Sequence, residues 1–352
     1  MQNSPLSRRA DEPLPEAREV ARGIWKITLP IPFPLRTVNV YALIGVDGWV
    51  LVDAGMGTPD SREAFAAGLE KAGLDVARLR AIVLTHHHPD HIGLSGELQE
   101  QSGAAVYMHP IDEKSLRIIW DETMPERFSS VSNFFSQHGL ERTQLWYTQS
   151  DPKAVRRVIR VPPHDAFTLV EDGEILELAG ESYRVFWVPG HSDGLICLYR
   201  EHDGVFLSAD HVLPRITPNI GLYSERDRPN PLGDYLDSLA KVEHLPAEIV
   251  LPGHGEPFAD LARRVHEIVE HHEKREQQIL QLLVEQPRHA AWLTEQLFQR
   301  RLNNDETRRM AMAEVLAHLE YLRLVGQVEQ RRTEEGIILY TPTEIPASGF
   351  QH

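Results

Sequence analysis

Residues 81–91 join an apolar run to a cluster of side chains that bind metals well, and this stretch constrains the rest of the chain. Its first four residues are apolar and predict a short buried strand. His86 and His88 lie two positions apart, so their side chains point the same way in an extended segment. Asp90 and His91 follow just past a bend and are aimed at a neighbouring point. A histidine-rich surface loop does not explain a carboxylate at this spacing after a buried strand, so the stretch predicts a metal site.

The heptapeptide Thr-His-His-His-Pro-Asp-His resembles the T-H-x-H-x-D-H signature of the metallo-β-lactamase superfamily. Three later segments resemble the remaining motifs of that family and occur in the same order: Pro189-Gly190-His191-Ser192-Asp193-Gly194, Leu207-Ser208-Ala209-Asp210 and Leu251-Pro252-Gly253-His254-Gly255. The resemblance runs from about residue 23 to about residue 258. It implies an α+β fold, namely the four-layer αββα sandwich of the superfamily, with the metals at one edge between two sheets.

The resemblance also implies a set of ligands for two divalent metal ions. The ligands of the first ion are His86, His88 and His191, those of the second are Asp90, His91 and His254, and Asp210 bridges the two ions. Asp53, which ends an earlier apolar strand, matches an aspartate that supports the ligands through hydrogen bonds. Zinc suits this mixture of nitrogen and oxygen donors, and iron or manganese would also fit.

This ligand set favours a metal-dependent hydrolase in which a metal-bound hydroxide attacks a small ester, thioester or lactone. Asp90 is the candidate catalytic residue, since it binds metal and can also orient the hydroxide and relay its proton. The segment around His191 resembles the glyoxalase II form of the family's second motif. Cys197 lies within an apolar run, so we expect it to pack in the core and not to bind metal.

The composition is that of an ordinary globular protein with an acidic balance. The chain has 352 residues, of which 41% are hydrophobic, and a formal net charge of −16. This charge argues against a general attraction to nucleic acid or to anionic membranes. A single cysteine allows no internal disulfide, and no apolar run approaches the ~18 residues of a membrane span. We expect a cytoplasmic protein with a small-molecule substrate and no membrane partner, and a homodimer is compatible with the sequence.

Composition and patterning divide the chain into four parts. Residues 1–19 predict a loose polar tail, residues 20–265 the catalytic domain, residues 266–345 a winged-helix-like domain and residues 346–352 a second tail. Within the catalytic domain, residues 111–160 form an aromatic-rich insert. Two interpretations of this insert stay open, a helical lid over the substrate or a segment whose aromatic side chains pack on the sandwich.

The C-terminal part of the sequence predicts three helices and a β-hairpin. The helical patterns cover residues 259–285, 291–299 and 305–325, and the hairpin strands cover residues 328–332 and 337–340. This order of elements is that of a winged-helix module. The segment also resembles the C-terminal module of the lactamase-beta-like endoribonucleases.

This module leaves two alternatives to a small-molecule hydrolase open. One is a single-strand endoribonuclease or phosphodiesterase. The other is a winged-helix regulator that senses a metabolite, for which Arg308 and Arg309 near the start of the predicted recognition helix are the support. Residues 270–344 hold 10 Lys and Arg against 13 Asp and Glu, which is a poor balance for phosphate contacts. We therefore expect the module to pack against its own catalytic domain or a second subunit and not to bind nucleic acid.

Seven ligand side chains predict that the purified protein carries about two metal ions per chain. Elemental analysis of protein reconstituted with zinc, iron or manganese measures this stoichiometry. At most one ion per chain in every reconstitution would contradict the two-ion site.

Overall fold

The computed structural model of the chain describes residues 16–120, 124–140, 157–225, 228–299, 302 and 304–343. Most of the predicted tails and parts of the predicted insert lie outside these ranges. Internal contacts divide the chain into two units, which are described separately. The first unit comprises residues 1–123, 150–218 and 238–265, and the second comprises residues 124–149, 219–237 and 266–352. The domain boundaries expected from the sequence stay predictions.

A seven-stranded sheet forms one layer of the first unit, with its strands in sequence order. Its strands are β1 (Ala17–Ala21), β2 (Ile24–Pro30), β3 (Thr37–Ile44), β4 (Trp49–Val52), β5 (Leu79–Val83), β6 (Ala105–Met108) and β7 (Phe167–Leu169). Strands β1 to β4 run antiparallel, whereas β4 to β7 run parallel. The buried strand predicted before the histidine cluster is confirmed as β5.

Strand β1 includes residues 17–19, which the sequence predicted as part of a loose tail. Ala17 is buried and pairs with Ile27 of β2, so the strand extends the antiparallel half of the sheet. Charged residues on an edge strand give only a weak strand pattern in a sequence, which explains the difference.

A five-stranded sheet forms the other layer of the first unit, in the order β12-β11-β10-β9-β8. Its strands are β8 (Ile175–Leu178), β9 (Glu181–Trp187), β10 (Ile196–Arg200), β11 (Val205–Ala209) and β12 (Ile249–Pro252). Neighbouring strands are antiparallel except for β11 and β12, which run parallel.

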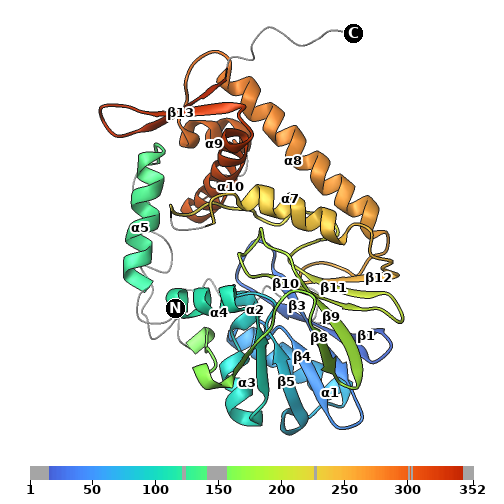
Figure 1. Ribbon diagram of the computed structural model, residues 1–352. Helices are drawn as coiled ribbons and strands as arrows, with labels where there is room; N and C mark the ends of the chain where they lie inside the picture. Colours follow the sequence, from blue (N-terminus) through green and yellow to red (C-terminus); the bar gives the residue numbers. More distant parts are fainter. Residues whose placement is uncertain are drawn as a thin grey trace. The chain divides into compact units, whose positions relative to one another are not determined.

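Apolar side chains on the facing surfaces of the two sheets form one continuous core. Tyr41 and Leu43 of β3 point into it from one sheet, and Leu198 of β10 and Leu207 of β11 point into it from the other. Figure 1 shows the two sheets packed against each other. Fully burying one such side chain contributes roughly 1.5–3 kcal/mol, so this core holds the strand ends of both sheets in place.

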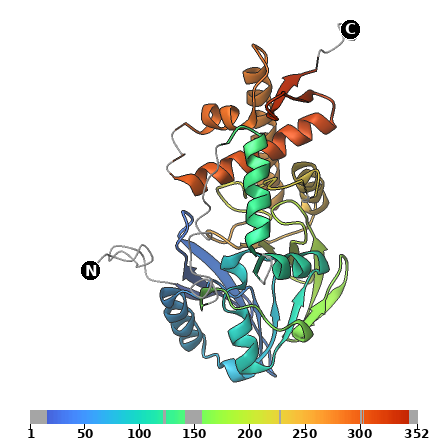
Figure 2. The ribbon, with the colours of Figure 1, turned by 90° about the vertical axis from the view of Figure 1, so that its left-hand side faces the viewer.

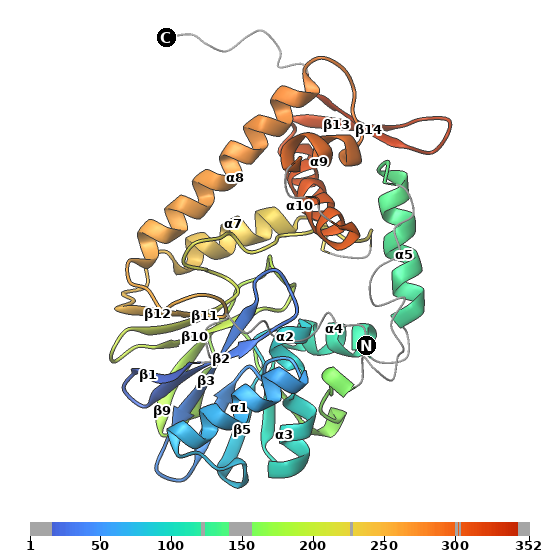
Figure 3. The same cartoon turned by 180° about the vertical axis from the view of Figure 1, so that it is seen from behind.

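Helices of the first unit follow strands of the parallel half of its sheet. They are α1 (Pro59–Ala72), α2 (Pro89–Ile92), α3 (Ser95–Ser102) and α4 (Pro110–Trp120). Helix α1 contacts β2 and α3 contacts β5, so both cover the outer face of the seven-stranded sheet (Figure 3). Cys197 of β10 is fully buried, as expected for a core residue.

The described residues of the second unit form helices and one β-hairpin. Its complete elements are α5 (Met124–Gln137), α9 (Ala290–Phe298), α10 (Asp305–Leu324), β13 (Val328–Arg332) and β14 (Ile338–Pro342), while α7 (Pro231–Val242) and α8 (Leu261–Leu283) have residues in both units. Asn304 caps α10 and forms a capping box with Thr307. Figure 2 shows α9 and α10 beside the hairpin. The three predicted helices and the hairpin are confirmed, whereas their assignment as a winged helix stays a prediction.

The described part of the predicted insert contributes to both units. Helix α4 belongs to the first unit and α5 to the second. Phe135 of α5 is buried, and its ring centroid lies 6.3 Å from that of Tyr223 in the same unit. The lid interpretation of the insert stays a prediction.

Among the described residues, no helix combines the length and the apolar character needed to cross a membrane. The cytoplasmic location expected from the sequence stays a prediction.

Two buried histidines of the second unit hydrogen-bond to each other. His272 Nδ1 on α8 lies 3.0 Å from His318 Nε2 on α10, and His318 Nδ1 lies 2.7 Å from the Glu314 carbonyl oxygen. His318 therefore donates from Nδ1 and accepts at Nε2, which keeps both rings neutral. Burial lowers the pKa of His272 to about 2 and that of His318 to about 4.

We expect this pair to make the protein less stable as the pH falls below about 6.5, the ordinary histidine pKa. Below that pH the unfolded chain takes up a proton on each imidazole, whereas the folded rings stay neutral. Each group then lowers the free energy of unfolding by about 1.4 kcal/mol per pH unit, and above pH ~6.5 neither contributes. Urea unfolding at pH 5 and pH 7 measures the effect.

The control for this experiment compares two histidines of the second unit. His318→Gln should make the dependence of stability on pH shallower, because it removes one imidazole that takes up a proton only when the chain unfolds. His266→Gln, which changes an exposed residue of α8 that pairs with Glu270, should alter the dependence much less than His318→Gln does. Identical pH dependence in the wild type and in His318→Gln would contradict the assignment.

Candidate metal centre

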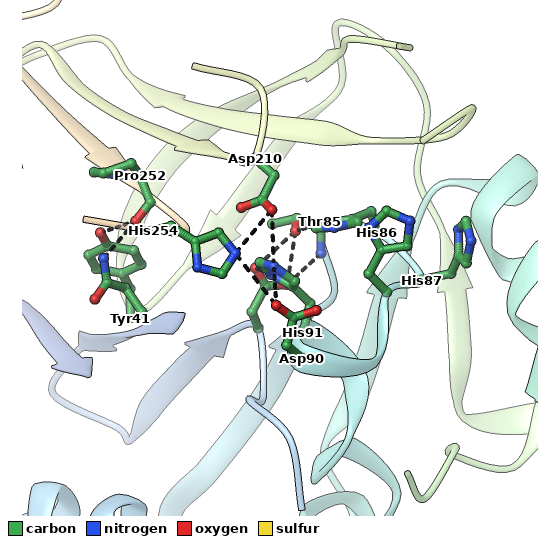
Figure 4. Close-up of polar contacts among 12 residues, drawn as sticks. Tyr41, Thr85, His86, His87, Asp90, His91, Asp210, Pro252 and His254 are labelled. Atoms are coloured by element: carbon green, nitrogen blue, oxygen red, sulfur yellow. Dashed lines mark hydrogen bonds and ion pairs between the residues drawn. The ribbon is translucent and has the colours of Figure 1, made fainter. Parts of the chain in front are cut away.

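The seven predicted ligands all lie at one edge of the two sheets, just beyond the ends of strands. The segment from His86 to His91 follows β5, His191 lies in the turn between β9 and β10, Asp210 follows β11 and His254 follows β12. Since β5 runs parallel to β4 and β12 runs parallel to β11, the carboxyl ends of each pair share an edge. The topology therefore gathers residues that are far apart in the sequence (Figure 4).

The first group of donors consists of His86, His88 and His191, whose candidate ligand atoms lie within 4.8 Å of one another. His88 Nδ1 lies 2.9 Å from His191 Nε2. His86 Nδ1 lies 2.9 Å from Thr85 Oγ1, and its buried Nε2 has no hydrogen-bond partner among the described residues. A buried imidazole nitrogen left in this state is suited to binding a cation.

The second group consists of Asp90, His91 and His254, which also meet within 4.8 Å. His91 Nδ1 lies 2.8 Å from Asp53 Oδ2, and His254 Nδ1 lies 2.6 Å from the Thr37 carbonyl oxygen. Both partners are acceptors, so each ring donates from Nδ1 and turns its Nε2 into the site. Figure 4 shows both rings beside Asp90.

Asp210 lies between the two groups of donors. Its Oδ2 is 3.2 Å from His254 Nε2, 3.4 Å from His191 Nε2 and 3.5 Å from His91 Nε2. Its Oδ1 is buried without a hydrogen-bond partner among the described residues. One carboxylate therefore reaches donors of both groups, and its role as a bridging ligand stays a prediction.

The backbone around Asp210 is shaped for this position. Ala209, directly before it, has a φ of 45°, in the left-handed region that costs a non-glycine residue roughly 1–2 kcal/mol. A Cβ atom added to Gly253 would collide with Asp210 Oδ1. Residue 253 must therefore be a glycine for the carboxylate to occupy its place.

Asp53 supports the cluster from the end of β4. Its Oδ1 accepts a hydrogen bond from the Thr85 N–H at 2.8 Å, and its Oδ2 accepts one from His91. The Thr85 hydroxyl lies within 3.0 Å of the Asp53 carboxylate and also meets His86. These contacts orient both imidazoles, and Thr85 is a contributor that the sequence interpretation did not single out.

The charge states of the site suit a cation. Burial lowers the pKa of His86 and His88 well below the usual range, so both rings are neutral. Burial raises the pKa of Asp210, but His254 and His91 outweigh it and hold that pKa well below its usual range. Burial lowers the pKa of His91, but Asp210 and further carboxylates outweigh it and raise that pKa. A cation at this point would compete with the proton of His91.

The donors fit divalent metal ions. One buried cluster contains His86 Nε2, His91 Nε2 and Asp210 Oδ1. None of these three atoms has a hydrogen-bond partner among the described residues. Mixed nitrogen and oxygen donors suit zinc, iron or manganese. The assignment of each residue to one ion or the other stays a prediction.

His87, inside the same motif, takes no part in the donor groups. Its Nδ1 lies 3.0 Å from Asp112 Oδ2, and Figure 4 shows its ring on the far side of His86 from Asp210. Asp112 of α4 also accepts hydrogen bonds from the His87 N–H and from the Ser192 hydroxyl. The sequence interpretation missed Asp112, because an acidic residue in the first turn of a helix usually interacts with the helix dipole.

Asn39 and Tyr41 of β3 hold the loop that carries His254, and the sequence interpretation missed both. Asn39 Nδ2 donates to the carbonyl oxygens of Pro252 at 3.0 Å and Gly255 at 2.7 Å. The Tyr41 hydroxyl donates to the Pro252 carbonyl at 2.7 Å (Figure 4). In the sequence the two residues only contribute to a strand pattern.

Two family profiles match successive parts of this chain. The profile of the metallo-β-lactamase superfamily matches residues 34–254, and the profile of the metallo-β-lactamase-like C-terminal domain matches residues 277–343. A probable metallo-hydrolase from Bacillus subtilis is 27% identical over 303 residues, which cover 84% of this chain and 91% of that protein.

Two solved structures are similar over nearly the whole chain. A metallo-β-lactamase family protein from Thermus thermophilus is 36% identical with a TM-score of 0.80, over 92% of this chain and 100% of the other. A β-lactamase domain protein from Burkholderia ambifaria is 28% identical with a TM-score of 0.80, over 95% and 96% of the two chains. With these similarities and with its histidine and aspartate donors gathered at one sheet edge, the chain belongs to the metallo-β-lactamase superfamily and is a hydrolase.

Proposed function

We propose that the protein is a binuclear metal-dependent hydrolase that acts on a small ester, thioester or lactone, with zinc as the first candidate metal and iron or manganese as alternatives. The position of Asp210 carries this proposal. Its Oδ2 lies 3.2 Å from a nitrogen of the second donor group and 3.4 Å from a nitrogen of the first. A carboxylate between two groups of donors supports two ions and not one.

Divalent ions in such a site supply activated water near neutral pH and polarise a carbonyl group. The residues of the chain hold the donors in place, since Asp53 fixes His91 and the Thr37 carbonyl fixes His254. Asp90 is the candidate proton relay. Its Oδ2 lies 3.5 Å from His254 Nε2, and its side chain keeps 12% of its surface exposed. A carboxylate that touches the donors and remains accessible can take a proton from the attacking water and pass it on.

Two observations support a small acyl substrate. The formal net charge of −16 disfavours a polyanionic substrate. An atrochrysone carboxyl ACP thioesterase from Aspergillus fumigatus is 22% identical over 216 residues, which cover 59% of this chain and 66% of that protein. This similarity makes thioesters the first class to test.

The contacts of two arginines support a C-terminal module that does not bind nucleic acid. Arg308 Nη1 lies 3.1 Å from Glu295 Oε1, and the Arg309 guanidinium lies 4.9 Å from the centroid of the Tyr223 ring. Phosphate contacts would compete with these interactions inside the second unit. We propose that the winged-helix-like arrangement serves packing, which leaves the ribonuclease and regulator functions as alternatives.

A panel of substrates tests the proposed class. We expect the metal-loaded protein to hydrolyse at least one acyl thioester, ester or lactone, and to leave phosphodiesters and single-stranded RNA intact. Turnover is followed by release of thiol or acid and, for RNA, by gel electrophoresis. Cleavage of RNA without any acyl hydrolysis would favour the ribonuclease alternative.

Asp210→Asn tests the bridging carboxylate. The substitution keeps the volume of the side chain but removes the charge that lies between the donor groups. We expect kcat/KM on the best substrate to fall by at least about 100-fold, since even residues that only support metal ligands cost about 10- to 100-fold. Asp203→Asn is the matched control, because Asp203 pairs with Arg200 at the turn that joins β10 and β11, at the other end of β11. Near-normal turnover in Asp210→Asn would show that the bridge is misassigned.

A further inference from the structure

We infer that Asp112 is a positioning residue that fixes the first group of donors, His86, His88 and His191, by joining the two loops that carry them. This inference rests on the proposed metal centre. Asp112 lies in the first turn of α4 and is fully buried. Its described hydrogen bonds go to His87, Ser192 and Gly194, which are neighbours of the predicted ligands, so it would act through these neighbours.

The Asp112 carboxylate accepts four hydrogen bonds from the two loops. Its Oδ2 lies 2.9 Å from the His87 backbone nitrogen, 3.0 Å from His87 Nδ1 and 2.8 Å from Ser192 Oγ. Its Oδ1 accepts from the Gly194 N–H at 2.8 Å. His87 stands between the ligands of one loop, and Ser192 follows the ligand of the other. One carboxylate thus sets the distance between the loops.

Residues from both ends of helix α4 form hydrogen bonds with His87. Asp112 in its first turn binds the backbone N–H and the ring of His87. Trp120 at its end donates its indole N–H to the His87 carbonyl oxygen at 2.9 Å. The backbone N–H, the backbone carbonyl oxygen and the ring of His87 are therefore all held by hydrogen bonds. The neighbouring ligands His86 and His88 are fixed with it.

The close approach of Gly194 is an independent sign that this contact matters. A Cβ atom added to Gly194 would lie 2.6 Å from the Asp112 nitrogen and 2.8 Å from Asp112 Oδ1. Both distances are shorter than real Cβ contacts, so only glycine lets the second loop reach the helix. The final glycine of the second motif is thus explained by the carboxylate that it binds.

The second group of donors is held by other residues. Asp53 and the Thr37 carbonyl orient His91 and His254, and Asn39 holds the loop that carries His254. Among the described contacts of Asp112, none reaches this group. Loss of Asp112 should therefore loosen one metal subsite and spare the other, whereas a general loss of stability would loosen both.

The test measures zinc affinity by calorimetric titration of metal-free protein in two backgrounds. His254→Ala leaves the first group of donors complete, and His86→Ala leaves the second group complete. We expect Asp112→Asn to lower the affinity by about 10- to 100-fold in the His254→Ala background and by less than about 3-fold in the His86→Ala background. Asn39→Ala should show the opposite pattern, and it serves as the matched control for the loss of a buried polar side chain.

Two further variants keep the inference falsifiable if Asp112→Asn folds poorly. Ser192→Ala removes one of the four hydrogen bonds and should lower the affinity of the first subsite by a few-fold only. Glu113→Gln changes the next residue of α4, which pairs with Arg117 and lies 3.4 Å from His164, and it should leave both affinities unchanged.

The outcomes separate this inference from the proposed function. Equal losses of affinity in both backgrounds, or none for Asp112→Asn and Ser192→Ala, would overturn the inference while the two-ion centre stands. A wild-type protein that binds no zinc, iron or manganese would overturn the proposed function and the inference with it.

Discussion

The ionised carboxylate of Asp210, buried among three imidazoles, is the constraint on which the rest of the first unit depends. Moving a charged group out of water costs several kcal/mol unless partners of opposite charge are supplied. The strained backbone of Ala209 and the bare backbone of Gly253 bring the carboxylate to this place, and His91 and His254 meet it there. The apolar core between the two sheets stabilises an arrangement that is locally unfavourable, which is common at functional sites.

Three of the four segments that carry predicted ligands are held by buried polar side chains. Asp53 holds the segment after β5, Asp112 joins that segment to the turn before β10, and Asn39 holds the loop after β12. These bonds go to backbone groups, to the hydroxyls of Thr85 and Ser192 and to ring nitrogens that face away from the centre. The inward Nε2 atoms of His86 and His91 have no hydrogen-bond partner among the described residues, so these two donors are oriented by the protein itself and not by the ion.

Motifs in the sequence predicted the donors and the supporting Asp53, but not Asp112 and Asn39, which also hold the segments that carry the donors. The apolar run before His86 and the spacing from there to His91 are visible within eleven residues. Helix α10 is likewise predicted from a local pattern, namely its helical periodicity and its Asn304 cap. Asp112 and Asn39 bind partners that are 80 and 213 residues away, so no local spacing marks them. Their roles follow only from the pairing of the strands, which a single sequence does not specify.

The parallel pairing of β11 with β12 also sets when the metal centre can form during folding. His86, His88 and His91 are neighbours in the chain and can gather early, whereas Asp210 and His254 arrive only after distant strands have paired and docked. Closing such long loops is slow, because the entropy cost precedes the gain in contacts. Before these strands pair, the chain offers an ion only part of the set of donors. We therefore expect tight binding only once the domain has folded. An ion bound at this site would then add to the stability of the folded chain by mass action, so the lifetime of the folded protein would rise with the supply of metal.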